Sequence, residues 1–562
     1  MAKFMAKDRH YNESEWIPKA YMTALEYMHL MKINPIENKL LSGDEYDLKK
    51  KEIVKSSPYR SKLIPGILVT SGNTYGRQKN KLYYKCIPND KDLPVFLVPY
   101  QDKSSSFNKN KLDKYVLFVF EKWNDKHPHG ILQQTIGDVS DMSAFEEHQM
   151  NCKLINHSIQ KFSKHTFKCV KKKSSEVSDI IDDIVKKYKI IDRTHEDVIS
   201  IDPEGCVDID DAISVKLDDE SPWKTCISVY IANVPLWFDY LDLWDNLDRR
   251  VSTVYLTAER RGMLPTILSE NLCSLKEGQR RFAISMDIEI NGDNISRVDF
   301  KNVLVKVKKN YAYDDVKLKE DSTYNEAEIM AKRINKKNNF IDEIADSHDV
   351  VQMYMVLMNN YIGKTLKDKL KKGVFRSFKA AAIDEKMNIP SELKSFARTW
   401  KSSGGIYTLD NKGHDMMNSV IDVYAHATSP IRRLVDLINM TLMNVYDGKI
   451  GDKGMHFAMR WFEKIDYINS QMKAIRKVQN DVKLLSICLG IEDLSDKRYR
   501  GYIIDREEVD SEYKYTVMLK DLSCISTFKT KDKYDLYDSS EYSLHIFNDE
   551  YNLKQKIRIH RL

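Results

Sequence analysis

The chain has 562 residues, with 89 Lys and Arg against 83 Asp and Glu, a net charge of +6 and 42% hydrophobic residues. This length exceeds what one hydrophobic core can organise, so we expect three to five domains. No apolar run approaches the roughly 20 residues that span a bilayer, and the N-terminal segment has no signal-peptide core. We therefore expect a protein that has no membrane partner.

The cysteines and the basic runs set further limits. The eight cysteines form no C-x-x-C pair, which argues against a disulfide frame and against a zinc knuckle. We expect reduced thiols and a cytoplasmic or other reducing intracellular compartment. Basic runs at residues 171–173, 186–187 and 301–309 have the composition of phosphate-binding surfaces. Such runs are more often solvated faces, so alone they leave nucleic-acid binding open.

The first 185 residues are expected to form three domains. Residues 1–55 contain the run YMTALEYMHLMK, whose apolar spacing predicts a helical N-terminal extension. Short Tyr- and Phe-rich runs separated by turn-formers then predict a cold-shock-like OB barrel at 56–110 and a second one at 111–185. Five aromatic residues here are candidates either for stacking on single-stranded bases or for the barrel cores: Tyr75, Tyr83, Tyr84, Phe96 and Trp123.

The rest of the chain is expected to form two domains. Residues 186–492 read as an α/β domain, because β-type runs dominate from 200 to about 310 and helical periodicity dominates from about 324. Residues 493–562 return to short strands and predict a C-terminal OB-type barrel. The predicted fold class is therefore multidomain, with OB-type β-barrels around a central α/β domain.

The segment SIDPEGCVDIDDAISV, residues 200–215, gathers four aspartates: Asp202, Asp208, Asp210 and Asp211. The Ile and Val residues that flank the acids indicate buried strands, which argues against a solvated turn. An EF-hand is excluded, because neither Asp202 nor Asp208 begins the required series of acids with a Gly at position 6. A site for two Mg²⁺ ions fits best, since hard cations take carboxylate oxygens and can clamp a phosphoryl displacement.

A second motif, YAHATSPIRRLVDLINM at residues 424–440, is compatible with phosphate binding. Ser429 is predicted to be the N-cap of a helix, which places Arg432 and Arg433 in its first turn. Positive charge there opposes the helix dipole, and a bound phosphate would compensate it. Neighbouring helix residues face different ways. We therefore expect one arginine at the scissile phosphate and the other holding the structure or the backbone, unless acids elsewhere in the fold pair with both.

These two motifs resemble the signature of the ribonuclease II (RNB) exoribonucleases, in the form of the exosome-type branch. DPEGCVDIDDA and HATSPIRRLVDL carry the resemblance, together with LPTILSENLCSLKEGQRRFAISM between them. It covers roughly residues 60–490 and implies an RNB catalytic domain at 186–492. It also implies a processive hydrolytic 3′→5′ exoribonuclease that degrades single-stranded RNA to nucleoside 5′-monophosphates, and we expect it to act as a monomer.

The resemblance also implies roles for individual residues. The four aspartates match the acids that hold two Mg²⁺ ions, with Mn²⁺ as an alternative, and Asp210 is expected to be catalytic. Arg432 matches the arginine that stabilises charge at the scissile phosphate. RNA-binding roles fall on three further residues, of which the tyrosines stack on bases: Tyr255, Tyr313 and Arg433.

Two departures and two rival readings remain. Asn233 stands where the family has an acid, and residues 1–55 are too short for the PIN domain of exosome catalytic subunits, so we expect no endonuclease activity. One rival is a catalytically inactive RNA-binding platform with an RNB fold. The other is a metal phosphoesterase that acts on DNA or small nucleotides. The complete set of acids argues against the first, and the OB-type runs argue against the second.

Overall fold

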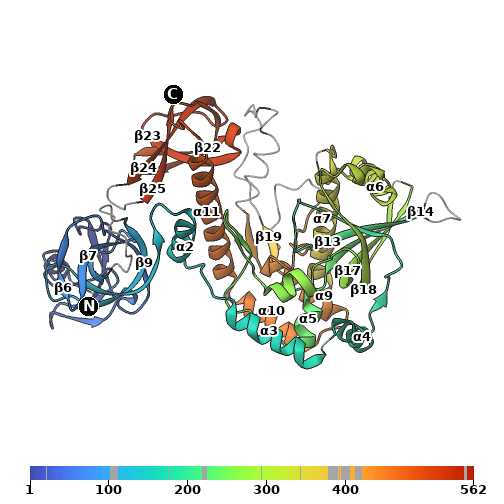
Figure 1. Ribbon diagram of the computed structural model, residues 1–562, viewed down its shortest axis with the longest axis horizontal. Coiled ribbons are helices and arrows are strands. Elements are labelled where there is room, and N and C mark those ends of the chain that lie inside the picture. Colours follow the sequence, from blue (N-terminus) through green and yellow to red (C-terminus); the bar gives the residue numbers. More distant parts are fainter. Residues whose placement is uncertain are drawn as a thin grey trace. The chain divides into compact units, whose positions relative to one another are not determined.

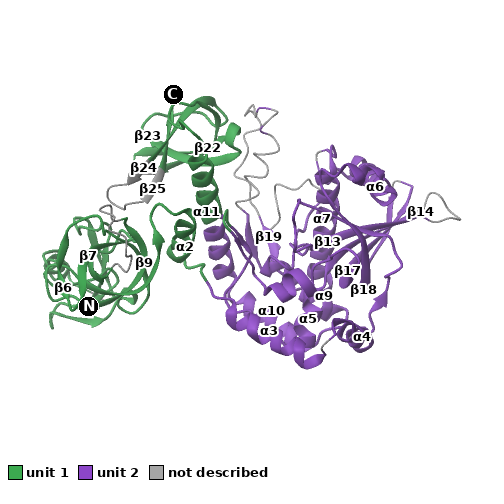
Figure 2. Ribbon diagram, in the orientation of Figure 1, with its two compact units in different colours: residues 1–156, 256–258, 477–562 green, residues 157–255, 259–476 purple. Residues whose placement is uncertain are grey.

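The computed structural model of the chain (Figure 1) contains two compact units (Figure 2). Unit 1 comprises residues 1–156, 256–258 and 477–562, and unit 2 comprises residues 157–255 and 259–476. No helix in the described part of the chain combines the length and the apolar composition that a membrane crossing needs. The structure describes residues 1–19, 22–101, 112–174, 176–217, 224–292, 294–341, 343–377, 390, 393, 405–411, 421–509, 511–549 and 554–562.

Residues 1–55 form a four-stranded antiparallel sheet with one short helix, and not the predicted helical extension. The strands lie in the order β2-β1-β3-β4. In β1 the side chains alternate between buried and half-buried, and Phe4 packs on Trp16 with ring centroids 5.3 Å apart. The prediction was wrong because the helical spacing of one run, now α1, outweighed the two-residue alternation of AKFMA. The elements are β1 (Ala2–Ala6), β2 (Ser14–Pro18), α1 (Ala24–Met31), β3 (Glu45–Asp47) and β4 (Glu52–Lys55).

Residues 64–138 form one OB-type barrel. The strand β5 pairs with β7 and β9, and β10 pairs with β9 and, in parallel, with β8, so the strands close in the ring β5-β7-β8-β10-β9. A closed five-stranded Greek-key ring is the OB architecture. The elements are η1 (Pro58–Arg60), β5 (Ile64–Leu68), β6 (Thr74–Gln78), β7 (Lys81–Pro88), β8 (Phe96–Tyr100), β9 (Lys114–Lys122) and β10 (His129–Asp138).

The predicted second barrel at 111–185 is not a separate domain. Its strands β9 and β10 complete the first barrel, and the remainder forms three helices: α2 (Met142–Cys152), α3 (Gln160–Lys173) and α4 (Val177–Tyr188). The N-terminal sheet and the barrel share one hydrophobic cluster, which includes Phe4, Trp16, Phe96 and Trp123. Two β modules, the N-terminal sheet and the barrel, therefore precede the α/β region. Their number agrees with the predicted fold class, but their boundaries differ from those predicted.

The α/β region is built on a second closed ring of five strands, β12-β13-β14-β17-β18. The strand β18 pairs antiparallel with β17 and, further along, in parallel with β12, which closes the ring. The β elements are β11 (Ile191–Asp192), β12 (Val198–Asp202), β13 (Asp211–Leu217), β14 (Lys224–Ala232), β15 (Val254–Tyr255), β16 (Arg260–Arg261), β17 (Arg280–Asn291), β18 (Asn294–Ala312), β19 (Phe375–Ser377) and β20 (Ile406–Thr408).

Helices accompany this ring (Figure 1). Among them, α9 is almost entirely buried, while α6 and α7 carry apolar residues on one side. The helical elements are α5 (Val234–Leu241), η2 (Ile267–Leu272), η3 (Val316–Glu320), α6 (Ser322–Asn338), α7 (Ser347–Thr365), η4 (Leu366–Leu370), α9 (Leu434–Tyr446), α10 (Asp452–Phe462) and α11 (Ile465–Leu489), the last with residues in both units.

Residues 493–562 contain a five-stranded antiparallel sheet in the order β23-β22-β21-β24-β25. Its core includes Ile503, Tyr515, Val517 and Tyr542. The chain is thus multidomain, with OB-type and other β domains beside an α/β domain, as its sequence predicted. The elements are β21 (Tyr499–Val509), β22 (Glu512–Leu519), η6 (Lys520–Leu522), β23 (Cys524–Thr530), β24 (Ser539–Asp549) and β25 (Lys554–Arg561).

A buried ion pair lies on one side of the ring in unit 2. Arg193 donates from Nη1 and Nη2 to the two carboxylate oxygens of Asp287, at 2.8 and 2.6 Å, and Ser228 Oγ donates to Oδ1 at 2.8 Å. Burial opposes the ionisation of Asp287, but Arg193, Ser228 and Lys301 together lower its pKa to about 2. The pair therefore favours the folded state wherever Asp287 is ionised.

The replacement Asp287→Asn should lower the free energy of unfolding by about 3 kcal/mol at pH 7, because the buried Arg193 would lose its bidentate partner and keep only Glu196, 3.7 Å from its Nε. Since the folded-state pKa lies below the ordinary value near 4, this stabilisation is complete above about pH 4 and is lost as the pH falls towards 2. Urea unfolding should therefore show a smaller difference between wild type and variant at pH 3 than at pH 7.

Asp299 provides the matched control, because it lies opposite Asp287 in register and pairs with Arg297, whose side chain is 63% exposed. The replacement Asp299→Asn should change the free energy of unfolding by less than about 1 kcal/mol. Equal losses in the two variants would contradict the role assigned to the buried pair.

Candidate active site

The four aspartates lie at neighbouring ends of β12 and β13. Asp202 ends β12 and Asp211 begins β13, while Asp208 and Asp210 lie in the loop between them. The N–H of Cys206 donates to the carbonyl of Pro203 at 3.1 Å. Gly205 in this turn has a φ of +75°, which suits glycine at the third position of a type II turn. The turn reverses the chain, so all four acids belong to one region.

The loop that carries the acids is fastened from a distant segment. Ser274 Oγ accepts from the N–H of Ile209 at 3.0 Å and donates to the carbonyl of Val207 at 2.9 Å. The N–H of Leu275 donates to the carbonyl of Ile209 at 3.0 Å. These bonds fix the backbone on both sides of Asp208 and next to Asp210.

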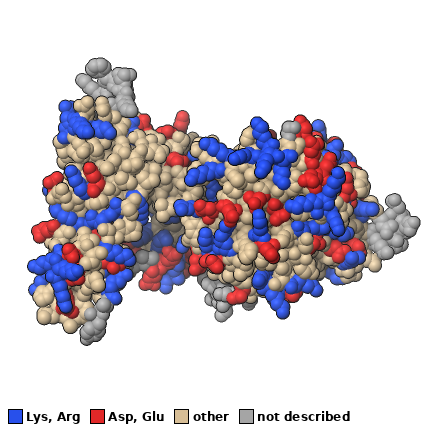
Figure 3. All heavy atoms as spheres, turned by 90° about the horizontal axis from the view of Figure 1, so that it is seen from below, with Lys and Arg blue, Asp and Glu red and all other residues tan. Residues whose placement is uncertain are grey.

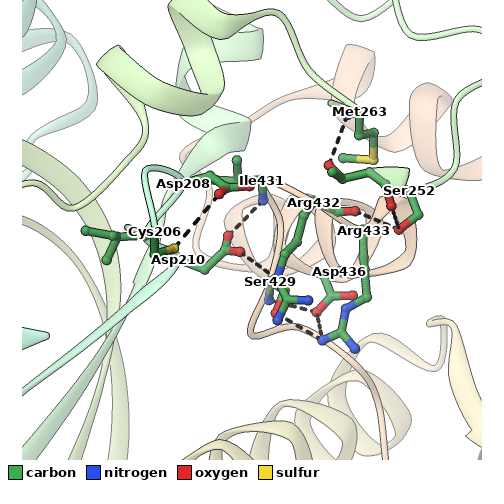
Figure 4. A network of polar contacts seen from close by, with 12 residues as sticks. Cys206, Asp208, Asp210, Ser252, Met263, Ser429, Ile431, Arg432, Arg433 and Asp436 are labelled. Carbon is green, nitrogen blue, oxygen red and sulfur yellow. Dashed lines mark hydrogen bonds and ion pairs between the residues drawn. The ribbon is translucent and has the colours of Figure 1, made fainter. Parts of the chain in front are cut away.

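Two arginines and one backbone amide partner the acids, and Figure 4 shows two of these three partners, Arg432 and the N–H of Ile431, beside Asp210. Asp210 Oδ1 accepts from the N–H of Ile431 at 2.9 Å, and Arg432 Nε lies 3.3 Å from Asp210 Oδ2. Arg260 donates from Nη1 to Asp208 and from Nη2 to Glu270. The two aspartates of the loop thus face opposite charge from two separate segments.

Burial raises the pKa values of three of the acids. Desolvation raises the pKa of Asp202 to about 6 and that of Asp210 to about 8, although Arg432 opposes both shifts. Desolvation, with the charges of Asp202 and Asp210, also raises the pKa of Asp211 well above its ordinary value. Asp202 Oδ2 and Asp210 Oδ2 are buried and accept no hydrogen bond. The site therefore holds carboxyl oxygens that its own donors do not satisfy.

The described residues do not form a complete set of metal ligands by themselves. No three Asp, Glu, His or Cys side chains among them converge closely enough to hold an ion. A metal at the aspartates would consequently need further ligands.

The helix after the second motif begins later than predicted. α9 starts at Leu434 with Arg433 as its N-cap. Ser429 instead begins a turn, in which the Ser429 carbonyl accepts from the N–H groups of Arg432 and Arg433 at 3.2 and 2.9 Å. The buried Asp436 holds this turn, because its Oδ1 accepts from the N–H of Ser429 at 2.8 Å. The placement of both arginines in the first helical turn was wrong.

The two arginines differ in their surroundings. Arg433 donates from Nη2 to Asp436 Oδ1 at 2.8 Å and to Ser429 Oγ at 3.2 Å, so it supports the turn. The Arg432 side chain is 42% exposed and lies beside Asp210. Its backbone carbonyl accepts from the N–H of Thr253 at 2.9 Å. This contact links the turn to the segment just before Tyr255.

The tyrosines predicted to bind RNA lie next to the acids. Tyr255 pairs in register with Arg260 in the hairpin of β15 and β16 and is 43% exposed. Burial raises its pKa to about 12, with Asp208 the next cause. The N–H of Tyr313 donates to the carbonyl of Asp202 at 3.1 Å. The Tyr313 ring stacks on His348 at a centroid distance of 3.6 Å and an angle of 14°.

Four of the five aromatic residues that were candidates for base stacking are buried in the protein. Tyr84, Phe96 and Trp123 belong to the hydrophobic cluster of unit 1, and Tyr83 is buried against His129. Tyr75 is 38% exposed, and Lys85 Nζ lies 5.2 Å from its ring centroid. Of these five candidates, only Tyr75 has an exposed ring for stacking.

Asn233 belongs to a network of amides. Its Nδ2 donates to Asn302 Oδ1 at 2.5 Å, and its Oδ1 accepts from Asn444 Nδ2 at 3.0 Å. The residue is buried. Neutral amides satisfy one another here, so the missing acid leaves no buried charge.

Several site residues were not identified from the sequence: Arg260, Glu270, Ser274, His348 and Asp436. Arg260 gave a weak signal, because it lies five positions after Tyr255 in a basic segment. Ser274 gave none, since its contact with Ile209 spans 65 positions.

Comparison with known proteins identifies the domain. The RNB domain model matches residues 190–345. The chain therefore contains an RNB domain. The chain is also similar to DIS3-like exonuclease 2 of Schizosaccharomyces pombe, 27% identical over 313 residues, which covers 52% of this chain and 32% of that relative. The chain spans about a third or less of the length of the first curated relatives that it matches.

Solved structures share the fold of this chain. RNase R of Mycoplasma genitalium, in complex with ribose-methylated single-stranded RNA, aligns over 100% of both chains with a TM-score of 0.69 and 16% identity. Yeast Ssd1, described as a pseudonuclease, aligns over 85% of this chain and 66% of its own, with a TM-score of 0.56 and 15% identity. At these identities the likeness shows the fold alone.

The two arginines of the motif should differ in their effect on stability. The replacement Arg433→Met should lower the free energy of unfolding by about 3 kcal/mol, because the buried Asp436 would lose its cation. Arg432→Met should cost less, because Arg432 is partly exposed and Asp210, with its pKa raised to about 8, can hold a proton at neutral pH. Urea unfolding of both variants measures the difference, and a larger loss in Arg432→Met would contradict it.

Proposed function

We propose that the chain is a hydrolytic 3′→5′ exoribonuclease that degrades single-stranded RNA processively to nucleoside 5′-monophosphates. The observation that carries this proposal is the gathering of four aspartates beside Arg432 at the ends of β12 and β13. The exonuclease named among the relatives supports the activity, and the RNA complex of the RNase R structure supports the ligand.

The aspartates fit a site for divalent cations. Asp202 Oδ2 and Asp210 Oδ2 are buried and accept no hydrogen bond, although Arg432 Nε lies 3.3 Å from the second of them. Burying carboxylate oxygens without hydrogen bonds is costly. A cation among the acids would compensate the desolvation that raises the pKa values of Asp202, Asp210 and Asp211. Carboxylate oxygens are the ligands that Mg²⁺ takes, with Mn²⁺ as an alternative.

We assign Asp202, Asp208, Asp210 and Asp211 as ligands of two Mg²⁺ ions. Water and phosphate oxygens of the RNA would complete the coordination, because Mg²⁺ keeps several waters and uses few protein ligands. This agrees with the incomplete ligand set among the described side chains. When bound, the two ions activate water and neutralise charge on the leaving oxygen.

The remaining residues bind and orient the RNA. Arg432 is a permanent cation with a partly exposed side chain, so it can donate to the scissile phosphate and stabilise the charge that develops there. The exposed ring of Tyr255 offers a stacking surface that any base can use. Tyr313 is held against His348 close to Asp202. Stacking of this kind suits degradation that is independent of sequence.

The second candidate function is an RNA-binding platform without catalysis. The likeness to a pseudonuclease favours it, because the same fold occurs there. The full set of aspartates favours catalysis, since four acids in a partly buried site repel one another and destabilise the fold unless cations lie among them. Measured activity decides between the two.

The variant Asp210→Asn should lose cleavage by more than about 100-fold, because one metal ligand is gone, and should bind RNA as well as the wild type or better. The loss of a negative charge does not weaken contacts between RNA and basic or aromatic side chains. A time course on 5′-labelled single-stranded RNA with Mg²⁺ measures cleavage, and fluorescence anisotropy measures binding.

The same time course needs three controls: EDTA, a DNA of matching sequence, and Asp299→Asn as an acid far along β18 from the site. Wild type and Asp299→Asn should both give a short 5′-labelled end product from the RNA, but not from the DNA and not in EDTA. Tight RNA binding by the wild type without shortening, under either Mg²⁺ or Mn²⁺, would establish the platform function instead.

Magnesium should raise the thermal midpoint of the wild type, because a ligand that binds only the folded state stabilises it by about 2.7 kcal/mol at a hundred times its Kd. The double variant Asp208→Asn, Asp210→Asn should show little or no rise, whereas Asp299→Asn should follow the wild type. Calorimetric scans with and without Mg²⁺ measure the shifts. A rise of equal size in all three proteins would mean that Mg²⁺ binds elsewhere.

A further inference from the structure

The helix α3 of unit 2 has a basic surface that the proposed active site does not use. Its 14 residues, QKFSKHTFKCVKKK, contain six lysines and no acid. Lys161, Lys164, Lys168, Lys171 and Lys172 are exposed or half-exposed. Among the described residues, none of these five forms an ion pair with an acidic side chain.

This charge pattern works against the stability of the helix. Lys164 has a lysine at i−3 and another at i+4, and like charges at such spacings destabilise a helix. Lys161 lies in the first turn, where positive charge opposes the helix dipole, and Ile159 at the N-cap gives no side-chain hydrogen bond. An anionic ligand along the helix would offset these costs.

An exposed aromatic ring lies among the lysines. Phe162 and Thr166 are buried, and Phe162 packs on Phe238 with ring centroids 6.0 Å apart. Phe167 is 60% exposed. Lys164 and Lys171 lie three and four positions from Phe167, which places all three on neighbouring turns of one face. The fold therefore uses one phenylalanine of α3 and leaves the other in solvent between cations.

We propose that the exposed face of α3 is a second binding surface for single-stranded RNA, separate from the aspartate site. Lysines contact phosphates, and an aromatic ring between them can stack on a base of any identity. A membrane fits less well, because a helix that lies on a bilayer buries a broad apolar face, whereas the apolar face of α3 is already packed against the protein. The surface does not depend on cleavage, so it can be tested in an inactive variant.

Figure 3 shows the molecule from the side on which α3 lies in Figure 1, and many Lys and Arg side chains are exposed on this face, with acidic ones between them. Nearby acids in sequence already have partners: Asp179 accepts from Ser174 Oγ at 2.9 Å, and Asp182 pairs with Arg280 at 2.8 Å. These two acids therefore do not neutralise the lysines of α3.

The test compares charge with stacking in the Asp210→Asn background, with a single-stranded RNA of about 30 nucleotides, longer than one OB domain binds. The double replacement Lys164→Glu, Lys168→Glu should weaken binding about tenfold or more at low salt. It should also reduce the slope of log affinity against log salt by about 1.4, since each lost phosphate contact of a single strand contributes about 0.7. Phe167→Ala should weaken binding about fivefold or more and leave the slope unchanged.

The matched control is Arg333→Glu, Lys336→Glu on α6, which makes the same change in net charge at two exposed positions. It should leave affinity and slope near those of the parent. An equal loss in this control would assign the effect to overall charge and overturn the proposal. Each variant should also have the same thermal midpoint of unfolding as the parent, which confirms that the compared proteins are folded.

Lysine acetylation read by mass spectrometry gives an independent measurement. Saturating RNA should protect Lys164 and Lys168 in the Asp210→Asn protein and leave Lys336 reactive. Unchanged reactivity of Lys164 and Lys168 while RNA is bound would overturn the proposal. It would also be overturned if anionic phospholipid vesicles protected these lysines from acetylation and RNA did not. Because cleavage is absent from these assays, their outcome is independent of the proposed exonuclease activity.

Discussion

The structure of unit 2 depends on keeping four carboxylates close together and partly out of water. Desolvation and mutual repulsion both oppose this arrangement, and the raised pKa values of Asp202, Asp210 and Asp211 express the cost. The protein offsets part of it with cations from two other segments, Arg432 at Asp210 and Arg260 at Asp208. Two carboxyl oxygens, one each of Asp202 and Asp210, accept no hydrogen bond. The protein thus offsets only part of the cost of burying the acids, and under the proposed function metal ions that also bind a phosphate would offset the rest.

The ring of strands shows how segments far apart in the sequence reach this place. Parallel pairing of β12 with β18 puts Asp202 opposite Ala312, and Tyr313 follows directly. The turn at residues 429–433 reaches Asp210 across 221 positions, and Asp436 and Arg433 hold that turn in shape. Arg432 can therefore face the acids because its neighbour carries the structural contacts.

The parts of the site that could be predicted are those written in short, local patterns. The aspartates and Arg432 occur in compact motifs that concentrate like charges within a few positions, and the resemblance of these motifs extends to Tyr255 and Tyr313. The start of α9 could not be predicted, because Ser429 is a good N-cap by local rules and only the tertiary contact with Asp436 turns it into a loop residue. Ser274 and His348 act through contacts that no local spacing reveals.

The same division applies to the fold. Short strands at 62–138 were visible in the sequence, but the parallel pairing of β8 with β10 decides that they form one barrel and not parts of two. In the N-terminal segment, one amphipathic run suggested a helix throughout, while the alternation in β1 decided the sheet. Periodicity identifies elements, whereas their allocation to domains follows from pairing over long distances.

Charge is used in two opposite ways in unit 2, and for this reason net charge says little about function. The proposed active site buries acids whose ionisation is opposed by desolvation, and α3 exposes cations that lack anions in the described part of the chain. Summed over 89 basic and 83 acidic residues, these features nearly cancel to +6. Under the two proposals, a polyanion bound together with divalent metal would satisfy both demands at once, since its phosphates would face the lysines while its reacting phosphate shared ions with the aspartates. A protein without such a ligand would bear both costs and recover neither.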